Sequence, residues 1–250
     1  MQDLNKNIMK IIINESQLRL IVENEEKKER LLTITVDMIV GGESFDDILE
    51  LYNTEKEKKN FVGIKLLGSV DFSRGFGNKI GSGVIEFCDE LVEVNGDLKV
   101  VNNYTVGFPK LRKVSGDMIL SMTEVRSLPE LRYVGRNLTL QRSKISELPE
   151  LKSVGSGLYL GNSKIESLPK LESTGGYLYL NDSPLADLGN LKSVGESLDL
   201  GNCQINSLPK LEFVGDDLYL EKTPLWRKLS EVMTKDEVRN KYGVNGNVYL

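Results

Sequence analysis

Asp97 and Asp117 are the two acidic residues whose spacing best matches a catalytic pair. They stand twenty residues apart, at the same position of a segment that repeats along the chain. Stacking of the repeats would bring their carboxylates towards the separation that a retaining glycosidase uses for nucleophile and acid. Paired acids beside a turn are more commonly solvated or turn-capping groups, and the sequence predicts no aromatic-lined cleft around them. A carboxylate-based glycosidase is therefore only a remote alternative.

The other residue types that carry chemistry are scarce. None of the 250 residues is histidine, which removes the commonest general base at neutral pH, the commonest metal ligand and every imidazole-dependent triad. The two cysteines, Cys88 and Cys203, are too far apart in the sequence to indicate a disulfide framework or a metal cluster, and they favour a reducing compartment. We expect no catalytic residues, no cofactor and no metal site.

Charge and hydropathy also limit the partners. The net charge is -5 and the Lys and Arg residues are scattered among acids, so a nucleic acid partner is not expected. The Gly-rich basic segment 74–83, RGFGNKIGSG, lacks the phosphate-binding G-x-x-x-x-G-K-[ST] frame. The apolar run IMKIII, residues 8–13, is too short for a signal sequence or a membrane span. We expect a cytoplasmic protein with no standard secretion signal and no membrane partner.

A twenty-residue repeat organises most of the chain. Each repeat carries a small apolar residue, a leucine or methionine four residues later, and a further apolar residue two positions on; most repeats continue with a Leu-Pro-x-Leu element. The first position is occupied by Val94, Val114, Val134, Val154, Thr174, Val194 and Val214. The final segment VNGNVYL, residues 244–250, matches the core of an eighth repeat.

The repeat that contains Tyr159 shows what this pattern predicts. Residues 157–160, GLYL, alternate in polarity, so we expect a short strand with inward-facing Leu158 and Leu160. Proline fixes φ and lacks the N–H that a helix interior needs, so the Leu-Pro-x-Leu element predicts an extended return. The other inward residues of this repeat are expected to be Leu148, Leu151, Val154 and Ile165. One coil cannot bury these side chains alone, so the coils should stack as a solenoid with a parallel sheet of eight strands.

The repeat resembles the short type of the leucine-rich repeat family. The family pattern L-x-x-L-x-L-x-x-N-x-L is matched by V-x-x-x-L-x-L-x-x-S-x-I followed by L-P-x-L, over about residues 88–250. The spacing and the Leu-Pro element are most similar to the repeats of bacterial effector proteins, and the phrase SVGxxLxL is similar to L-domain repeats. The resemblance implies an α/β solenoid with a short-strand parallel sheet on its concave face and an extended or 3₁₀ convex side.

The same resemblance implies a structural role for one further column. The family's asparagine, which is buried and hydrogen-bonds the turn backbone of neighbouring coils, falls here on small polar residues. They are Asn103, Thr123, Ser143, Ser163, Ser183, Cys203 and Thr223. This position accounts for Cys203 without a catalytic thiol.

The segments on either side of the seven repeats, residues 88–227, are interpreted as caps. Residues 1–62 are predicted to be helical, with helices over 16–30 and 45–59; residues 31–40 fit a strand or a helix, and helix is favoured. Residues 63–87 are expected to hold one or two degenerate strands.

Residues 228–250 are predicted to form a short cap helix and a final strand. Thr234 and Glu237 match a capping box, and Gly243 is the expected helix stop. Trp226 is expected to cover the last coil rather than bind a ligand.

The residue between the two strand leucines faces outward and varies. From this column we select Lys99, Thr139, Tyr159, Tyr179, Asp199, Tyr219 and Tyr249, together with the neighbouring Tyr177, as candidate partner-binding residues. Tyrosine suits interfaces because it offers a large rigid area with a polar tip. An alternative explanation is that tyrosine favours exposed strand positions and stacks on its neighbours across the sheet. Both explanations stay open.

The sequence therefore predicts a non-catalytic protein-protein recognition module that binds its partner through the concave sheet face. The alternative is a structural component of a virion or other assembly, in which the solenoid packs against copies of itself or other shell proteins. Residues 10–23, KIIINESQLRLIVE, resemble the N-termini of tailed-bacteriophage proteins. That second resemblance would place the protein in a host cytoplasm or a virion.

Overall fold

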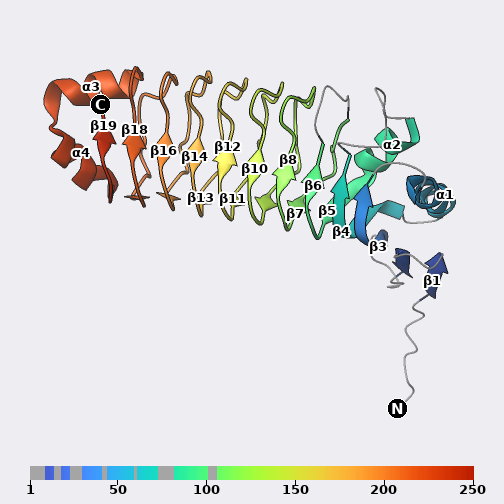
Figure 1. The fold of residues 1–250 in the computed structure, drawn as a ribbon. Coiled ribbons are helices and arrows are strands. Elements are labelled where there is room, and N and C mark those ends of the chain that lie inside the picture. The colour runs from blue at the N-terminus through green and yellow to red at the C-terminus, as the bar shows by residue number, and fades with distance from the viewer. Residues whose placement is uncertain are drawn as a thin grey trace, which may run out of the picture.

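The fold is a row of stacked coils with a few helices at its two ends (Figure 1). The computed structural model describes residues 9–13, 18–22, 30–40, 44–58, 61–72, 82–100 and 106–250. The helices are α1 (Ser44–Lys56), α2 (Ser82–Glu90), α3 (Pro224–Val232) and α4 (Lys235–Tyr242). None of the helices in these ranges is long and apolar enough to cross a membrane.

Each regular coil contributes two very short strands, which form two parallel ladders. The first ladder consists of β5 (Leu91–Val94), β7 (Lys113–Val114), β9 (Tyr133–Val134), β11 (Ser153–Val154), β13 (Ser173–Thr174), β15 (Ser193–Val194) and β17 (Phe213–Val214). The second ladder consists of β6 (Leu98–Lys99), β8 (Met118–Ile119), β10 (Leu138–Thr139), β12 (Leu158–Tyr159), β14 (Leu178–Tyr179), β16 (Leu198–Asp199), β18 (Leu218–Tyr219) and β19 (Val248–Tyr249). The second ladder is the parallel sheet predicted from the repeat.

The register of both ladders repeats the sequence period. Tyr159 pairs with Tyr179 and Ser153 pairs with Ser173, so each residue lies beside its equivalent in the next coil. β19 pairs with β18, which confirms that the last segment adds one more rung. The first ladder was not anticipated, because two residues are too few to show a period of two.

The apolar columns of the repeat form one continuous core. In the coil that contains Tyr159, the predicted inward residues are all buried. They are Leu148, Leu151, Val154, Leu158, Leu160 and Ile165. Between β7 and β18 the return side of the coils contains no helix, as expected, but the Leu-Pro-x-Leu element is a turn rather than a continuous extended run. In it, Leu171 donates its N–H to the carbonyl of Leu168, three residues earlier, at 3.2 Å.

The described residues of the N-terminal region are mainly strand, so the prediction of a helical region is wrong for them. β1 (Met9–Ile13) and β2 (Leu18–Val22) are antiparallel, β2 is antiparallel to β3 (Arg30–Val40), and β3 is parallel to β4 (Phe61–Asp71). β4 pairs with both β5 and β6, so one long strand meets both ladders and joins this region to the solenoid. Among the described residues of this region, α1 alone is helical as predicted, at Ser44–Lys56.

Residues 31–40 form a strand because a partner strand is available on each side. In the described part of β3, Leu32 and Ile34 are buried while Leu31 and Thr33 are half-buried, which is the alternation of a strand. The prediction for residues 63–87 is also partly wrong, since Ser82–Glu90 is the helix α2 and not a strand. Its buried Val84, Phe87 and Cys88 have helical spacing.

The C-terminal cap has the predicted helix and one more. In α4, Thr234 and Glu237 form both hydrogen bonds of a capping box, and Gly243 ends the helix at φ 57°, which confirms both assignments. The additional helix α3 starts directly after Thr223, whose hydroxyl accepts the N–H of Trp226 at 2.8 Å. Trp226 is half-buried and packs against the core.

A column of glycines lies where neighbouring coils approach each other most closely. At Gly155, an added Cβ would lie less than 3.0 Å from the carbonyl oxygen of Gly135 in the preceding coil. The Gly155 N–H donates to Val134 O at 2.8 Å, and this bond holds the backbone next to the Gly135 carbonyl in register. The same close approach occurs at Gly135, Gly175, Gly195 and Gly215. These glycines are needed for space, not for a positive φ.

We predict that Gly155→Ala lowers the free energy of unfolding by about 1–3 kcal/mol, because the methyl group overpacks a backbone contact that cannot move aside. Gly201→Ala is the matched control, since its Cβ would lie 3.2 Å from the Asp199 side chain and 4.0 Å from the nearest backbone atom, the Glu221 carbonyl oxygen. Urea unfolding followed by circular dichroism measures both. Equal losses for the two variants would contradict the close-approach explanation.

Candidate functional site

The predicted partner-binding residues lie together on the outward side of the second ladder. Cross-strand pairing places Lys99 beside Ile119, Thr139 beside Tyr159, Tyr179 beside Asp199, and Tyr219 beside Tyr249. All of these side chains are half-buried. We call the part of this surface that carries Tyr159, Tyr177, Tyr179, Tyr219 and Tyr249 the tyrosine face.

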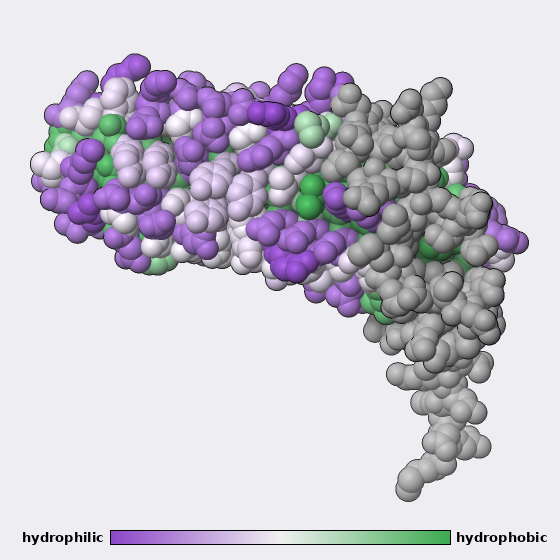
Figure 2. All heavy atoms as spheres, in the orientation of Figure 1, coloured by the Kyte–Doolittle hydropathy of each residue, from purple (hydrophilic) through white to green (hydrophobic). Residues whose placement is uncertain are grey.

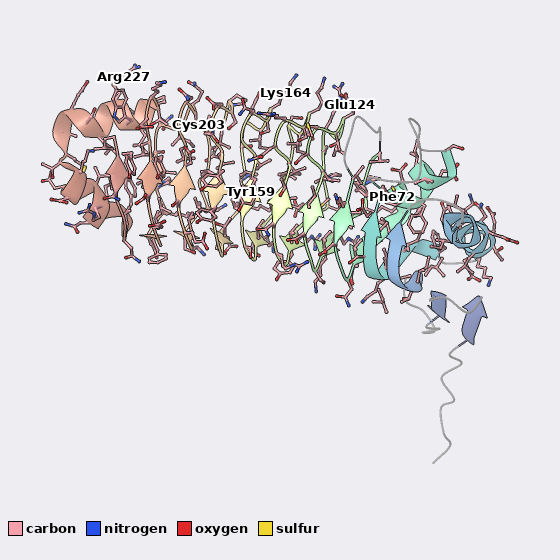
Figure 3. All side chains as sticks on the ribbon, viewed as in Figure 1. Phe72, Glu124, Tyr159, Lys164, Cys203 and Arg227 are labelled. Carbon is pink, nitrogen blue, oxygen red and sulfur yellow. The ribbon has the colours of Figure 1, made fainter. Side chains whose placement is uncertain are left out.

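Figure 2 shows this side of the row of coils, with pale side chains along its middle and hydrophilic ones around them. Figure 3 labels Tyr159 at the middle of the same side, whereas Glu124 and Lys164 lie along one edge of the row. The tyrosine face is therefore separate from the turns that carry those two charged residues.

The tyrosine rings contact one another in two groups. Tyr177 and Tyr179 are stacked with ring centroids 5.2 Å apart, and Tyr159 lies against Tyr179 at 5.5 Å. Tyr219 and Tyr249 are nearly parallel, 3° apart in plane and 4.4 Å apart in centroid. These contacts hold the rings in fixed positions, and stacking also covers ring faces that would otherwise meet solvent.

A ladder of side-chain oxygens runs beside the tyrosines, two residues earlier in each coil. Asp97 Oδ1 accepts the N–H of Asp117 at 2.8 Å, Asp117 Oδ1 accepts the N–H of Asn137 at 2.9 Å, and Asn137 Oδ1 accepts the N–H of Gly157 at 2.9 Å. In the last coils Asp217 Oδ1 accepts the N–H of Asn247 at 2.7 Å. The recurrence of Asp, Asn and Ser at this position was the sequence signal for the ladder, and its structural meaning was missed.

The oxygen ladder is interrupted where the aromatic group begins. Gly157 has no side chain, and a Cβ there would lie 2.6 Å from the Tyr159 hydroxyl oxygen, so the Tyr159 ring occupies that space. Tyr177, at the equivalent position of the next coil, stacks on Tyr179 instead of binding a backbone amide. Gly157 and Tyr177, which replace the Asp, Asn or Ser of this column, thus allow three tyrosine rings to lie together.

Asp97 and Asp117 are occupied by structural contacts. Besides the ladder bonds, both carboxylates pair with Arg136, at 2.5 Å to Asp97 and 3.2 Å to Asp117. The two carboxylates raise the pKa of the Arg136 guanidinium. A glycosidase needs one protonated acid and one free carboxylate, and this geometry gives no support to that role.

The coils that carry the tyrosines also carry unpaired acids. Glu196, Asp199, Asp216, Asp217 and Glu221 lie on or beside the face, and within the described part of the chain none of them forms an ion pair. The charge of Glu196 and its hydrogen bond raise the pKa of Tyr177. Burial, together with the charges of Asp182 and Glu221, raises the pKa of Asp199. Of these acids, only Asp199 was among the residues predicted to bind a partner.

The predicted polar column is buried, and its hydrogen bonds remain mostly within each coil. The hydroxyls of Thr123, Ser143, Ser183 and Thr223 donate to the carbonyl three residues earlier, at 2.6–2.7 Å. Cys203 instead donates its thiol to Leu180 O in the preceding coil at 3.1 Å. Ser163 is also buried, and Asn103 lies outside the described residues. Burial raises the pKa of the Cys203 thiol.

Other candidate sites do not add to this surface. Most of the Gly-rich basic segment, residues 74–81, lies outside the described residues. Among the residues that the structure describes, no three Cys, Asp or Glu side chains gather closely enough to hold a metal ion.

Comparison with known proteins leaves the site to be interpreted on its own geometry. The chain matches no protein family model, no curated protein and no solved structure.

We predict that Asp117→Ala lowers the free energy of unfolding by about 0.5–1.5 kcal/mol, because the N–H of Asn137 loses its acceptor. Asp117→Asn keeps an oxygen at that place and should lose less. Urea unfolding of the two variants measures the difference. Equal stability of both variants would show that the ladder bond contributes nothing.

A second prediction concerns pH. Burial, and the hydrogen bond to Asp217 at 3.1 Å, raise the pKa of Tyr219 above its ordinary value. A raised phenol pKa stabilises the folded state at lower pH, and this contribution is lost as pH rises above about 10. Unfolding free energies measured from about pH 9 upward should fall less steeply for Tyr219→Phe than for the parent. Equal slopes would be evidence against the raised pKa.

Proposed function

We propose that this protein is a non-catalytic recognition module that binds a partner protein through the tyrosine face. The observation that supports the proposal most is the group of three contacting rings, Tyr159, Tyr177 and Tyr179, on an outward strand surface. Half-buried tyrosines held by mutual stacking lose little conformational entropy on binding. Simple strand preference explains tyrosine at one column, but not the glycine at position 157 that makes room for a ring.

We also propose that the solenoid is a variant of the short leucine-rich repeat type. The twenty-residue period, the buried Leu-Pro-x-Leu leucines and the buried small polar column support this assignment. Two features differ from the family pattern. There are two strands in each coil, and the polar column mostly donates within its own coil.

Assembly of copies into a larger particle is less well supported. End-to-end stacking needs an open coil at each end, and α3 and α4 follow the last full coil with buried Leu229, Val238 and Tyr242. Side-by-side packing of copies through the tyrosine face is the remaining form of that alternative, and the experiment below separates it from binding to a different protein.

The triple variant Tyr159→Ala, Tyr179→Ala, Tyr219→Ala should lose a captured partner while remaining folded. Buried interface tyrosines commonly contribute about 2 kcal/mol or more each, so loss should exceed a hundredfold. Affinity capture with mass spectrometry, repeated with purified partner, measures it.

The matched control is Tyr133→Ala with Phe213→Ala, which removes two exposed aromatic side chains from the first ladder. This control should keep every partner. If capture by the triple variant equals capture by the parent, the tyrosine face is not the binding surface. If the captured protein is the chain itself, the assembly alternative is correct.

A further inference from the structure

The two halves of the outward surface of the second ladder differ in whether their acidic side chains form ion pairs. In the N-terminal half, acids are neutralised by the chain's own cations: Arg136 pairs with Asp97 and Asp117, and Lys99 pairs with Asp71 at 3.5 Å. In the C-terminal half, the strand segments and the residues beside them contain no Lys or Arg. These segments are residues 156–161, 176–181, 196–201, 216–221 and 246–250. Within the described residues, Glu196, Asp216 and Glu221 of this half form no ion pair, so negative charge lies among its tyrosines.

From this contrast we infer that the tyrosine face binds a positively charged, extended segment of a partner protein, with Lys or Arg side chains placed over Glu196, Asp216 and Glu221. The inference rests on the proposed function and specifies the chemistry of the partner. It assigns to these three acids a role in binding that the oxygen ladder and the coil turns do not require of them.

The arrangement of the acids fits a linear cation-rich segment. Neighbouring coils of a parallel sheet are about 4.8 Å apart, and alternate side chains of an extended peptide are about 6.6 Å apart. Glu196 and Asp216 lie on adjacent coils, so two cationic side chains of one segment can reach them. Tyr177 lies on the coil before them, and Tyr249 lies on the rung after them. The aliphatic stems of Lys and Arg can pack against these rings.

Other ligands fit this surface less well. Sugars bind by stacking on open ring faces, whereas Tyr219 and Tyr249 cover each other at 4.4 Å and Tyr177 covers Tyr179 at 5.2 Å. A divalent cation needs several carboxylates around one point, and no such group occurs among the described residues. Nucleic acid would bring phosphates against unpaired carboxylates. What the face offers is hydroxyl and carboxylate oxygens, which accept hydrogen bonds from guanidinium and ammonium groups.

The test uses the full chain and three labelled peptides of equal length: basic GKSRSKSG, which has cations at alternate positions, acidic GESESESG and neutral GSAGSSAG. Fluorescence anisotropy measures their binding. The parent should bind the basic peptide at least about tenfold more tightly than the other two, and the preference should shrink as salt rises from about 50 mM to about 300 mM, because screening weakens exposed charge pairs.

Two variants of equal net charge locate the binding. Glu196→Gln, Asp216→Asn, Glu221→Gln removes three charges from the face. None of these side chains accepts a backbone N–H in the oxygen ladder. The amide oxygens introduced by Asp216→Asn and Glu196→Gln can still accept the hydrogen bonds that the Ser197 and Tyr177 hydroxyls donate to the two carboxylates.

The matched control variant, Glu147→Gln, Glu166→Gln, Glu212→Gln, removes three exposed charges elsewhere.

The face variant should bind the basic peptide about tenfold more weakly than the parent, since three exposed pairs contribute a few-fold each. The control variant should stay within about twofold of the parent, by the same reasoning applied to distant screened charges.

Several outcomes would overturn the inference. Equal weakening by the two variants would show a net-charge effect without a site, and equal affinity of the parent for all three peptides would show no preference for cations. A partner that is lost on the Tyr→Ala changes but kept by the face variant would leave the proposed function standing and remove this inference. A partner kept by the Tyr→Ala variant removes the proposed function, whereas the peptide titrations still report on the charges.

Discussion

The structure depends on the backbone contact between neighbouring coils. Each coil is too thin to bury its own leucines or to satisfy its own strand amides, so both tasks fall to the coils on either side. The pairing of Ser153 with Ser173 and of Tyr159 with Tyr179 transfers one register along the whole row. The glycine column is the consequence of that contact, because Gly155 approaches the Gly135 carbonyl too closely for any side chain.

This constraint divides the positions of a repeat into two kinds. Positions that face the core, the glycine column, the buried polar column and the oxygen ladder are set by neighbouring coils. The outward position between the strand leucines is free of these demands, and there the side chain changes from Lys99 through Thr139 to Tyr159. Recognition is therefore expected to depend on the positions that the stacking leaves open.

The sequence predicted the parts of the fold that are repeated, and it predicted poorly the parts that depend on a single partner strand. Seven equivalent repeats average out local ambiguity, so the second ladder, its core and its last rung followed from the period alone. Residues 31–40 occur once, and their apolar residues fit both a strand and a helix. The structure forms a strand there because β4 is a parallel neighbour. The α3 helix has Thr223 at its N-cap and Pro224 after it, but Thr223 and Leu225 also fit the polar and apolar positions of the repeat, which predict a coil turn there.

The candidate site follows the same division. The period predicts that the tyrosines lie in one row. It does not predict which acids lack an ion pair, because the sequence does not show whether a cation lies next to a carboxylate such as Glu196. The structure shows that no described cation pairs with it. The interruption of the oxygen ladder at Gly157 and Tyr177 shows the cost of this surface. Each missing side-chain acceptor gives up a hydrogen bond worth about 1 kcal/mol, while the ring contact of Tyr159 with Tyr179 in the next coil returns a similar amount. The two coils therefore exchange one form of coil-to-coil contact for another, and the exchange brings aromatic area to the outside without loosening the row.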